Sequence, residues 1–309
     1  MKFFDHVSLD KSRLRKKKIG DNLIMAEMLG VPSLSIGDEI MNYVCDTTLG
    51  KINLHDHISK AQRDRRDGEG VFTLFLTFPP VPDPVTVSDL AWLGKGTSRN
   101  ELAVRGINVV GIICCTTFDF KAFITEIPQI IEDETWDLTD IPFVVDEDGT
   151  LHRLLGQVRP GKEDAINGRV ECSLTLLVNP EREVAFTAMY PWSTGRNWPE
   201  FLRTFDSMRI TRLYPDLGTW ANWQPGGQDG MLIRPSFQQN GLILSDEECE
   251  KRFPKGHFEC LYPWFRITPI PDLPYENAAM AASSDVSDEE EAAGDGRATR
   301  PGTAGVLGA

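Results

Sequence analysis

A proline-rich stretch is the first place where this chain could do chemistry. Residues 78–86, with the sequence FPPVPDPVT, follow the apolar residues 71–77 and precede a helical pattern at residues 87–93. A loop from a strand to a helix lies at the carboxyl edge of an α/β sheet, where the helix N-terminus can stabilise an anion. Thr86 could be a nucleophile there if a base lay beside it, or it could cap the helix. No base is near it in the sequence, which favours the cap.

Two other motifs carry side chains that could bind a ligand. Arg196, within residues 190–197 (YPWSTGRN), could be a fixed cation for an anion or a thiolate, or form a salt bridge at the start of the next helix. His55-Asp56-His57 could contribute metal ligands, or it could be a turn or a helix cap. Since no other ligands accompany these two histidines, we expect no metal and no cofactor.

The six cysteines do not form a recognisable site. No two of them make a C-x-x-C pair, so the spacing of metal ligands is absent. Cys114 and Cys115 are adjacent in a strand-like run, so their side chains point to opposite faces. We interpret the cysteines as buried, reduced thiols. They are Cys45, Cys114, Cys115, Cys172, Cys249 and Cys260.

Short apolar runs alternate with helical patterns through the middle of the chain, which predicts α/β units around a sheet. The expected strands are residues 71–77, 108–114, 143–145, 172–178 and 184–188, and the expected helices are residues 87–93, 120–131 and 198–208. After residue 212 the chain becomes rich in Trp, Pro and Gly, with one helix expected at residues 245–253. Ser245 and Glu248 form a capping box at the start of that helix.

The two ends of the chain carry opposite charge. Residues 1–35 form a basic arm, whose first 20 residues hold seven basic and two acidic side chains. Residues 273–309 form an acidic tail with seven acidic and two basic side chains. The tail has few bulky apolar residues, so we predict that it is disordered. Each end could be a solvated extension or a docking element for a protein partner.

Composition excludes several classes of protein. The chain has 309 residues and a net charge of −14, which repels nucleic-acid backbones. No apolar run approaches the roughly 20 residues that cross a bilayer, so we expect no membrane span. The first residues lack the order of a secretory signal. We therefore expect a cytoplasmic protein.

The segment from Gly37-Asp38 through residues 47–56 (TTLGKINLHD) resembles the opening of the 1-Cys peroxiredoxins. Residues 72–79, 142–146 and 190–197 match that family in the same order, and residues 223–256 match its small C-terminal domain, including the R-F-P-K-G sequence at 252–256. The resemblance implies a thioredoxin-like α/β domain at residues 36–212, a C-terminal peroxiredoxin domain at 213–272, and a capacity to form homodimers.

The active-site motif departs from the family. Members carry P-x-x-x-T-x-x-C, and alignment on Pro79 puts Asp83 at the threonine and Thr86 at the peroxidatic cysteine. Phe78 stands where the family has histidine, so only Pro79 and Arg196 remain of the catalytic set.

A second activity reported for some members, phospholipid hydrolysis, also lacks its nucleophile. His55 matches the family histidine, but the serine position falls at about Val71.

The resemblance therefore implies a catalytically silent peroxiredoxin homologue with a structural or interaction role, and no catalytic residues among Pro79, Asp83, Thr86 and Arg196. An alternative is a thiol peroxidase that uses a cysteine outside the family position, and a third reading is an anion binder using Arg196. Residues 300–304 (RPGTA) resemble short segments of proteins of cilia and flagella, which suggests that compartment.

Overall fold

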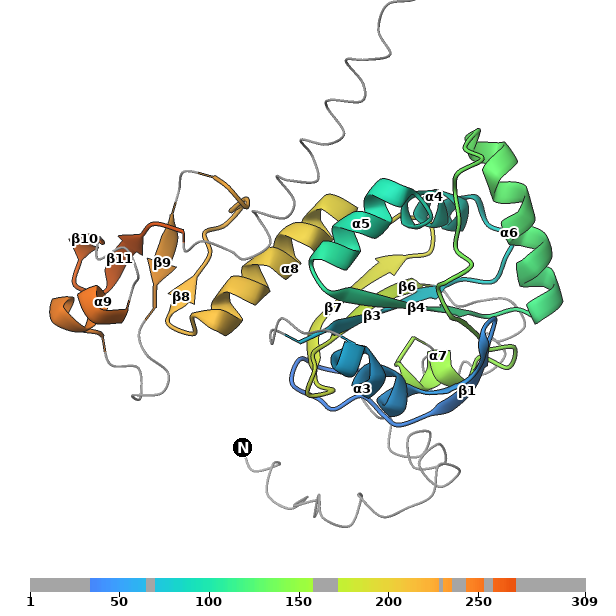
Figure 1. The fold of residues 1–309 in the computed structure, drawn as a ribbon, viewed down its shortest axis with the longest axis horizontal. Coiled ribbons are helices and arrows are strands. Elements are labelled where there is room, and N and C mark those ends of the chain that lie inside the picture. Colours follow the sequence, from blue (N-terminus) through green and yellow to red (C-terminus); the bar gives the residue numbers. More distant parts are fainter. Residues whose placement is uncertain are drawn as a thin grey trace, which may run out of the picture. The chain divides into compact units, whose positions relative to one another are not determined.

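A computed structural model describes residues 34–64, 70–157, 172–227, 230–234, 243–252 and 258–270. The chain divides into two compact units, one ending at Arg196 and the next beginning at Asn197 (Figure 1). Helix α8 (Trp198–Leu213) belongs to the second unit, whereas the expected boundary lay at its end. The acidic tail and nearly all of the basic arm lie outside the described residues. Among the described helices, none is long and apolar enough to cross a membrane.

The first unit is built on a seven-stranded mixed sheet in the order β2-β1-β5-β4-β3-β6-β7. Strands β3, β4 and β5 are parallel, and β1, β2, β6 and β7 pair antiparallel with their neighbours. The α/β architecture predicted from the sequence is therefore confirmed. The strands are β1 (Val44–Thr47), β2 (Gly50–Asn53), β3 (Phe72–Phe78), β4 (Ile107–Ile113), β5 (Phe143–Val145), β6 (Cys172–Val178) and β7 (Val184–Pro191).

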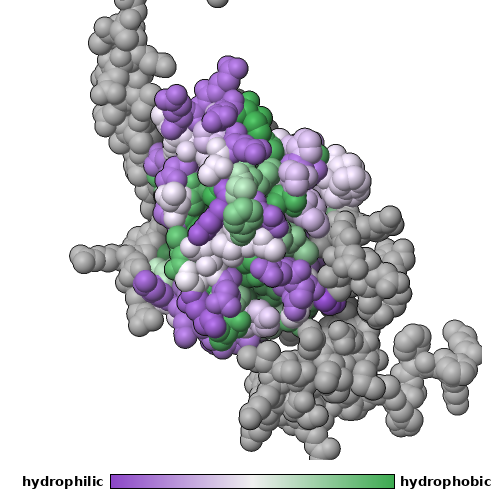
Figure 2. All heavy atoms as spheres, turned by 90° about the vertical axis from the view of Figure 1, so that its right-hand side faces the viewer, coloured by the Kyte–Doolittle hydropathy of each residue, from purple (hydrophilic) through white to green (hydrophobic). Residues whose placement is uncertain are grey.

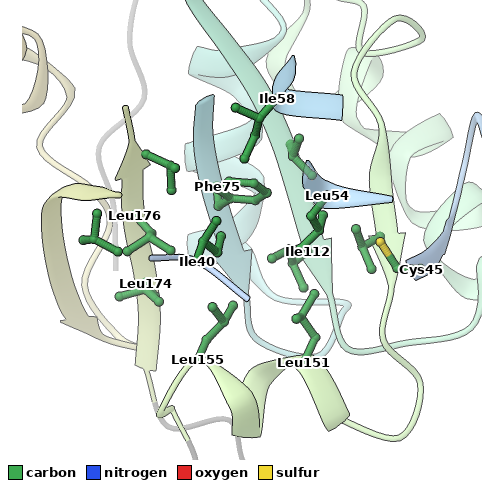
Figure 3. Packing of buried hydrophobic residues seen from close by; sticks show 14 residues of the cluster. Ile40, Cys45, Leu54, Ile58, Phe75, Ile112, Leu151, Leu155, Leu174 and Leu176 are labelled. Atoms are coloured by element: carbon green, nitrogen blue, oxygen red, sulfur yellow. The ribbon is translucent and has the colours of Figure 1, made fainter. Parts of the chain in front are cut away.

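Helices cover both faces of this sheet. Helices α4 (Pro84–Leu93), α5 (Gly96–Val104) and α6 (Thr117–Ile131) lie on one face, and α3 (Leu54–Asp64) and α7 (Thr150–Leu154) lie on the other (Figure 1). Side chains of α3 and α7 point into a core with those of β3, β4 and β6 (Figure 3). Because both faces are covered, all seven residues of β3 are buried. The point where β3 ends and the loop to α4 begins is therefore held firmly.

The expected elements match the observed ones closely except at their ends. Strands β5 and β6 have the predicted bounds, while β7 continues to Pro191 instead of ending at residue 188. Helices α4 and α6 each begin three residues earlier than expected, at Pro84 and Thr117. Their first turns contain proline and polar residues, which suit a helix start but do not show apolar periodicity. Helices α3, α5 and α7 and the β1–β2 hairpin were not anticipated. The strands of the hairpin are short and partly exposed.

The second unit combines α8 and α9 (Asp246–Arg252) with a four-stranded sheet in the order β10-β11-β9-β8. Its strands are β8 (Leu217–Gly218), β9 (Met231–Ile233), β10 (Glu259–Tyr262) and β11 (Phe265–Thr268). Trp223 is buried in its core, together with Leu217 and Cys249. The predicted capping box is present: Ser245 N–H donates to Glu248 Oε2 at 3.0 Å, and Glu248 N–H donates to Ser245 Oγ at 3.3 Å.

Candidate functional site

Helix α4 begins directly after the proline-rich loop, and its N-cap is Asp83. Asp83 Oδ2 accepts the backbone N–H of Thr86 at 2.7 Å and the hydroxyl of Thr86 at 2.9 Å. Pro84 opens the first helical turn, where its missing N–H leaves no hydrogen bond unmade. The assignment of Thr86 as the cap is therefore wrong in detail, because Thr86 is the residue that the cap binds.

The N-terminal turn of α4 already holds a carboxylate of its own chain. Thr86 is only 1% exposed, so its hydroxyl faces Asp83 rather than solvent. The positive end of the helix dipole, which could stabilise a bound anion, is met instead by the charge of Asp83. The partner of the hydroxyl is a carboxylate and not an imidazole, so the turn lacks the usual base for an alcohol nucleophile.

Arg196 is buried beside this turn and is bound by the protein itself. Its Nη1 donates to Asp89 Oδ2 at 2.5 Å, and its backbone N–H donates to Asp89 Oδ1 at 3.0 Å. The Nε atom donates to the hydroxyl of Thr175 at 2.9 Å. The Nη2 atom donates to the backbone carbonyl oxygens of Thr77 and Leu174. Most of the five N–H groups of the guanidinium thus have acceptors within the fold.

The charge of Arg196 is balanced within the fold. The side chains of Arg196 and Asp89 are 2% and 5% exposed, so their ion pair is shielded from water. Burial lowers the pKa of Arg196, an effect opposed by the charge and hydrogen bond of Asp89. The other carboxylate near this turn, Asp83, caps α4 and is not the ion-pair partner of Arg196. Of the two readings of Arg196, the salt bridge is the one that the geometry supports, with a partner on α4.

Asp89 is the residue of this site that the sequence analysis missed. It lies three positions after Thr86, and therefore on the same face of α4. It is the single carboxylate within Pro84–Leu93, and it is buried. A buried carboxylate inside a mostly apolar helix implies a buried cation, and this signal could have identified Arg196 as its partner.

A second buried pair of polar side chains, His152 and Asp146, lies near the end of β3. His152 Nδ1 is 2.6 Å from Asp146 Oδ2, and His152 Nε2 is 3.3 Å from the backbone carbonyl oxygen of Phe78. Both ring nitrogens of His152 thus lie within hydrogen-bond distance of an oxygen atom of the fold. Burial by itself raises the pKa of Asp146, but the hydrogen bond and charge of His152 and two backbone N–H groups outweigh it, so the pKa lies below its usual value.

The histidine motif on α3 is divided between separate structural contacts. His55 Nε2 lies 2.7 Å from the carbonyl oxygen of Ile40, and His55 Nδ1 lies 3.3 Å from Arg182 Nη1. His57 Nε2 lies 2.8 Å from Asn108 Nδ2, and burial lowers the pKa of His57, with a smaller contribution from Lys60.

No group of metal ligands forms around the histidine motif in the described part of the chain. No three His, Cys, Asp or Glu side chains there are grouped as metal ligands would be. Val71, at the serine position implied by the resemblance, is buried and has no hydroxyl.

None of the six thiols belongs to α4 or to the loop that precedes it. Burial, with nearby carboxylates, raises the pKa of Cys45 and Cys115 to about 12 and that of Cys114 to about 11. Burial also raises the pKa of Cys249. Cys172 is half-buried beside Gln157. Cys260 is exposed on β10, so the expectation of buried thiols is wrong for this residue. A nucleophilic thiol needs the opposite shift, toward a stable thiolate.

Curated proteins similar to this chain are peroxiredoxins, although no protein-family model matches it. It is 30% identical over 226 residues to the 1-Cys peroxiredoxin PER1 of Hordeum vulgare, which covers 73% of this chain and 92% of that protein. It is 28% identical over 246 residues to Peroxiredoxin-6 of Gallus gallus, covering 78% of this chain and 100% of that protein.

Solved structures of the same class share the fold. A mutant of Peroxiredoxin 6 from Arenicola marina superposes with a TM-score of 0.62 at 23% identity, covering 78% of this chain and 100% of that one. A yeast mitochondrial 1-Cys peroxiredoxin superposes with a TM-score of 0.59 at 22% identity, covering 76% of this chain and 99% of that one. Together these likenesses support the thioredoxin-like α/β assignment of the first unit.

Proposed function

Since this chain belongs to the 1-Cys peroxiredoxin family, we propose that it is a catalytically silent member with a structural or interaction role. The observation that carries the proposal is the first turn of α4, where Thr86 takes the position that the motif gives to the peroxidatic cysteine. Its hydroxyl is bound to the capping carboxylate of Asp83 at 2.9 Å. An alcohol in this place leaves the turn without a sulfur nucleophile.

The chemistry of peroxide reduction explains why this substitution matters. The reaction needs a thiolate, which forms because a thiol with a pKa of about 8.5 can be shifted toward neutrality by a helix N-terminus and a cation. The same field cannot usefully ionise an alcohol, and an alcohol has no sulfenic-acid stage through which to cycle. The cation is also engaged, because Arg196 is paired with Asp89.

The alternative, a thiol peroxidase that uses a different cysteine, has less support. Three of the six thiols have a pKa of about 11 to 12. Cys249 is completely buried. Cys172 contacts the side chain of Gln157, and Cys260 lies in the second unit. None of these places a thiol at the helix N-terminus that the family uses.

Peroxide consumption by the full chain, with a thiol reductant, tests the silent assignment. We expect the unmodified protein to consume peroxide no faster than free cysteine does, and the double variant Asp83→Thr with Thr86→Cys to gain turnover. The matched control is Thr117→Cys, which places a thiol in the exposed first turn of α6 without a neighbouring Arg196. The control should stay inactive.

Rapid turnover by the unmodified protein would overturn the proposal and would point to one of the six native cysteines. Single Cys→Ser variants would then identify it. Gain of activity in the Thr117→Cys control equal to that of the double variant would also count against the proposal, since any accessible thiol would then suffice.

We also propose that the basic arm and the acidic tail bind protein partners, supported by their opposite charge in the sequence. A homodimer is a further proposal, supported by β7, the outermost strand of the first sheet, where Met189 is 49% exposed. Sedimentation of the full chain, and of a chain without residues 1–33 and 271–309, separates these modes, because loss of the ends should abolish the complexes that they mediate and leave the homodimer intact.

Cellular location is part of the same proposal. We infer a cytoplasmic protein, with the cilium or flagellum as the specific compartment, supported by the tail sequence at residues 300–304. Imaging of the tagged full chain in ciliated cells tests this, and absence of the signal from cilia would reject the ciliary assignment.

A further inference from the structure

The β10–β11 hairpin of the second unit presents an exposed strand edge. Strand β10 is outermost in its sheet, and all four of its residues are exposed. Within the described residues, no strand pairs with its outer side. An edge strand of this kind leaves outward-facing N–H and C=O groups that can pair with another chain.

A row of aromatic rings extends from the core to this edge. Trp220 packs against the core of the second unit, and its ring contacts Phe265 with centroids 5.5 Å apart. Phe265 contacts Trp264 at 5.6 Å, and Trp264 stacks on Tyr262 at 5.8 Å. Tyr262 and Trp264 are 62% and 61% exposed. The ring contacts fix the two exposed side chains in advance, which lowers the entropy lost on binding.

The surroundings of the hairpin favour a cationic partner. Glu259 on β10 and Glu247 and Glu250 on α9 are exposed. Arg266 on β11 is buried and donates to Asp246 at 2.8 Å. Arg252 donates to Asp216 at 2.5 Å, which leaves Lys251 as the other basic residue of α9.

Other surfaces and a second copy of the chain fit less well. The face of the first unit that carries α6 mixes hydrophilic and hydrophobic side chains (Figure 2), including the exposed Phe118 and Ile130. Only one of those two side chains is aromatic, whereas the hairpin exposes two rings that stack on each other. A second copy would bring the same carboxylates together in a chain of net charge −14.

We propose that β10 binds an extended, basic segment of a partner protein as an added antiparallel strand. Backbone groups of the edge supply the pairing, and the side chains supply the selection. The partner places a lysine or arginine opposite Glu259, where opposite charges across strands attract, and apolar side chains against Tyr262 and Trp264. This rests on the proposed interaction role and names a surface and a class of partner for it.

Two synthetic octapeptides test the proposal with the full chain. One alternates lysine with valine and the other alternates glutamate with valine, and both carry a fluorophore for anisotropy titration. We expect the lysine peptide to bind at least tenfold more tightly than the glutamate peptide, with weaker binding at higher salt. The Trp264→Ala variant should weaken binding about tenfold, as loss of an aromatic anchor does. The matched control, Trp192→Ala, removes a 55% exposed tryptophan from the first unit and should leave binding unchanged.

The charge requirement is tested separately with Glu259→Lys, which should reduce the preference for the lysine peptide at least tenfold. Equal binding of both peptides, or equal effects of Trp264→Ala and Trp192→Ala, would overturn the proposal. A dimer of the unmodified chain that Trp264→Ala dissociates would also overturn it, because the occupant would then be a second copy. Peroxide turnover would refute the silent assignment but would leave these binding results unchanged.

Discussion

The first turn of α4 and the β10–β11 hairpin differ in the burial and bonding of their side chains. At the turn, Thr86 is bound to Asp83 and Arg196 to Asp89, and all but the cap are deeply buried. At the hairpin, large aromatic side chains are left in solvent although the core lies next to them.

The difference indicates where each region directs its interactions. A site whose polar groups are satisfied within the chain gains stability but has little left for a ligand. A surface that exposes aromatic rings lacks the stabilisation that burial of those rings would add to the fold, and such surfaces are typical of binding sites. In this chain the polar groups at the first turn of α4 are bound within the fold, whereas the hairpin exposes its aromatic rings.

Breaking the ion pair at the turn should have the largest effect on stability. Asp89→Ala leaves the guanidinium of Arg196 buried without its counter-charge, so we expect a loss of about 3–5 kcal/mol in the free energy of unfolding. The control is Glu101→Gln, which removes an exposed partner of Arg105 and should cost less than about 1 kcal/mol. Urea unfolding measures both, and equal losses would contradict the buried role of the pair.

Removing the carboxylate of Asp146 should change how the stability of the fold depends on pH in acid. The pKa of Asp146 is depressed in the folded chain, so its contribution is present above its unfolded pKa of about 3.9 and is lost as the pH falls through the folded value. Asp146→Asn should therefore cost about 1–3 kcal/mol at pH 7 and flatten the fall of stability in acid.

Urea midpoints between pH 7 and pH 2 measure this dependence. The exposed neighbour Glu147 provides the control, because Glu147→Gln should leave the curve close to that of the unmodified chain. An unchanged acid slope in Asp146→Asn would show that the buried pair with His152 does not govern it.

Loss of the helix cap should have a smaller effect. Asp83→Ala removes the acceptor of the Thr86 N–H and hydroxyl, and we expect a cost of about 1 kcal/mol. Thermal unfolding measures it, and Ser88→Ala one turn further along is the control, since Ser88 is exposed. A loss of stability well above about 1 kcal/mol would indicate that Asp83 stabilises the turn through contacts other than these two hydrogen bonds.

Truncating the hairpin should change stability least. Trp264 is 61% exposed, so Trp264→Ala should alter the free energy of unfolding by no more than about 0.5 kcal/mol while it weakens peptide binding. A large loss of stability would mean that the ring supports the core of the second unit, and the contrast between the two regions would disappear.

Sequence reasoning recovered strands β3 to β7 of the first unit because they are apolar runs between polar turns, but it did not predict helices α3, α5 and α7. It also found the capping box at Ser245, which depends only on residues close in the chain. It placed Thr86 and Arg196 in one site through the family resemblance, and they do lie on adjoining parts of the first unit. The short strands of the β1–β2 hairpin lack a pattern of their own, because tertiary pairing defines them.

The partners within the site could not be read in the same way. Arg196 and Asp89 are 107 positions apart, and His152 meets the carbonyl group of Phe78 across 74 positions. Such contacts depend on how the strands are ordered in the sheet, which no local spacing encodes. The cap assignment failed for a different reason: Asp83 and Thr86 both suit a helix start, and only the backbone angles distinguish them.

All seven residues of β3 are buried, and α4 follows this strand after a short loop. The sheet therefore determines the position of residue 86, whichever side chain that residue carries. Residue 86 is therefore a suitable position for protein engineering. Cysteine, selenocysteine or an unnatural nucleophile could be introduced at this residue and compared within the same fold, with the native threonine as the negative control.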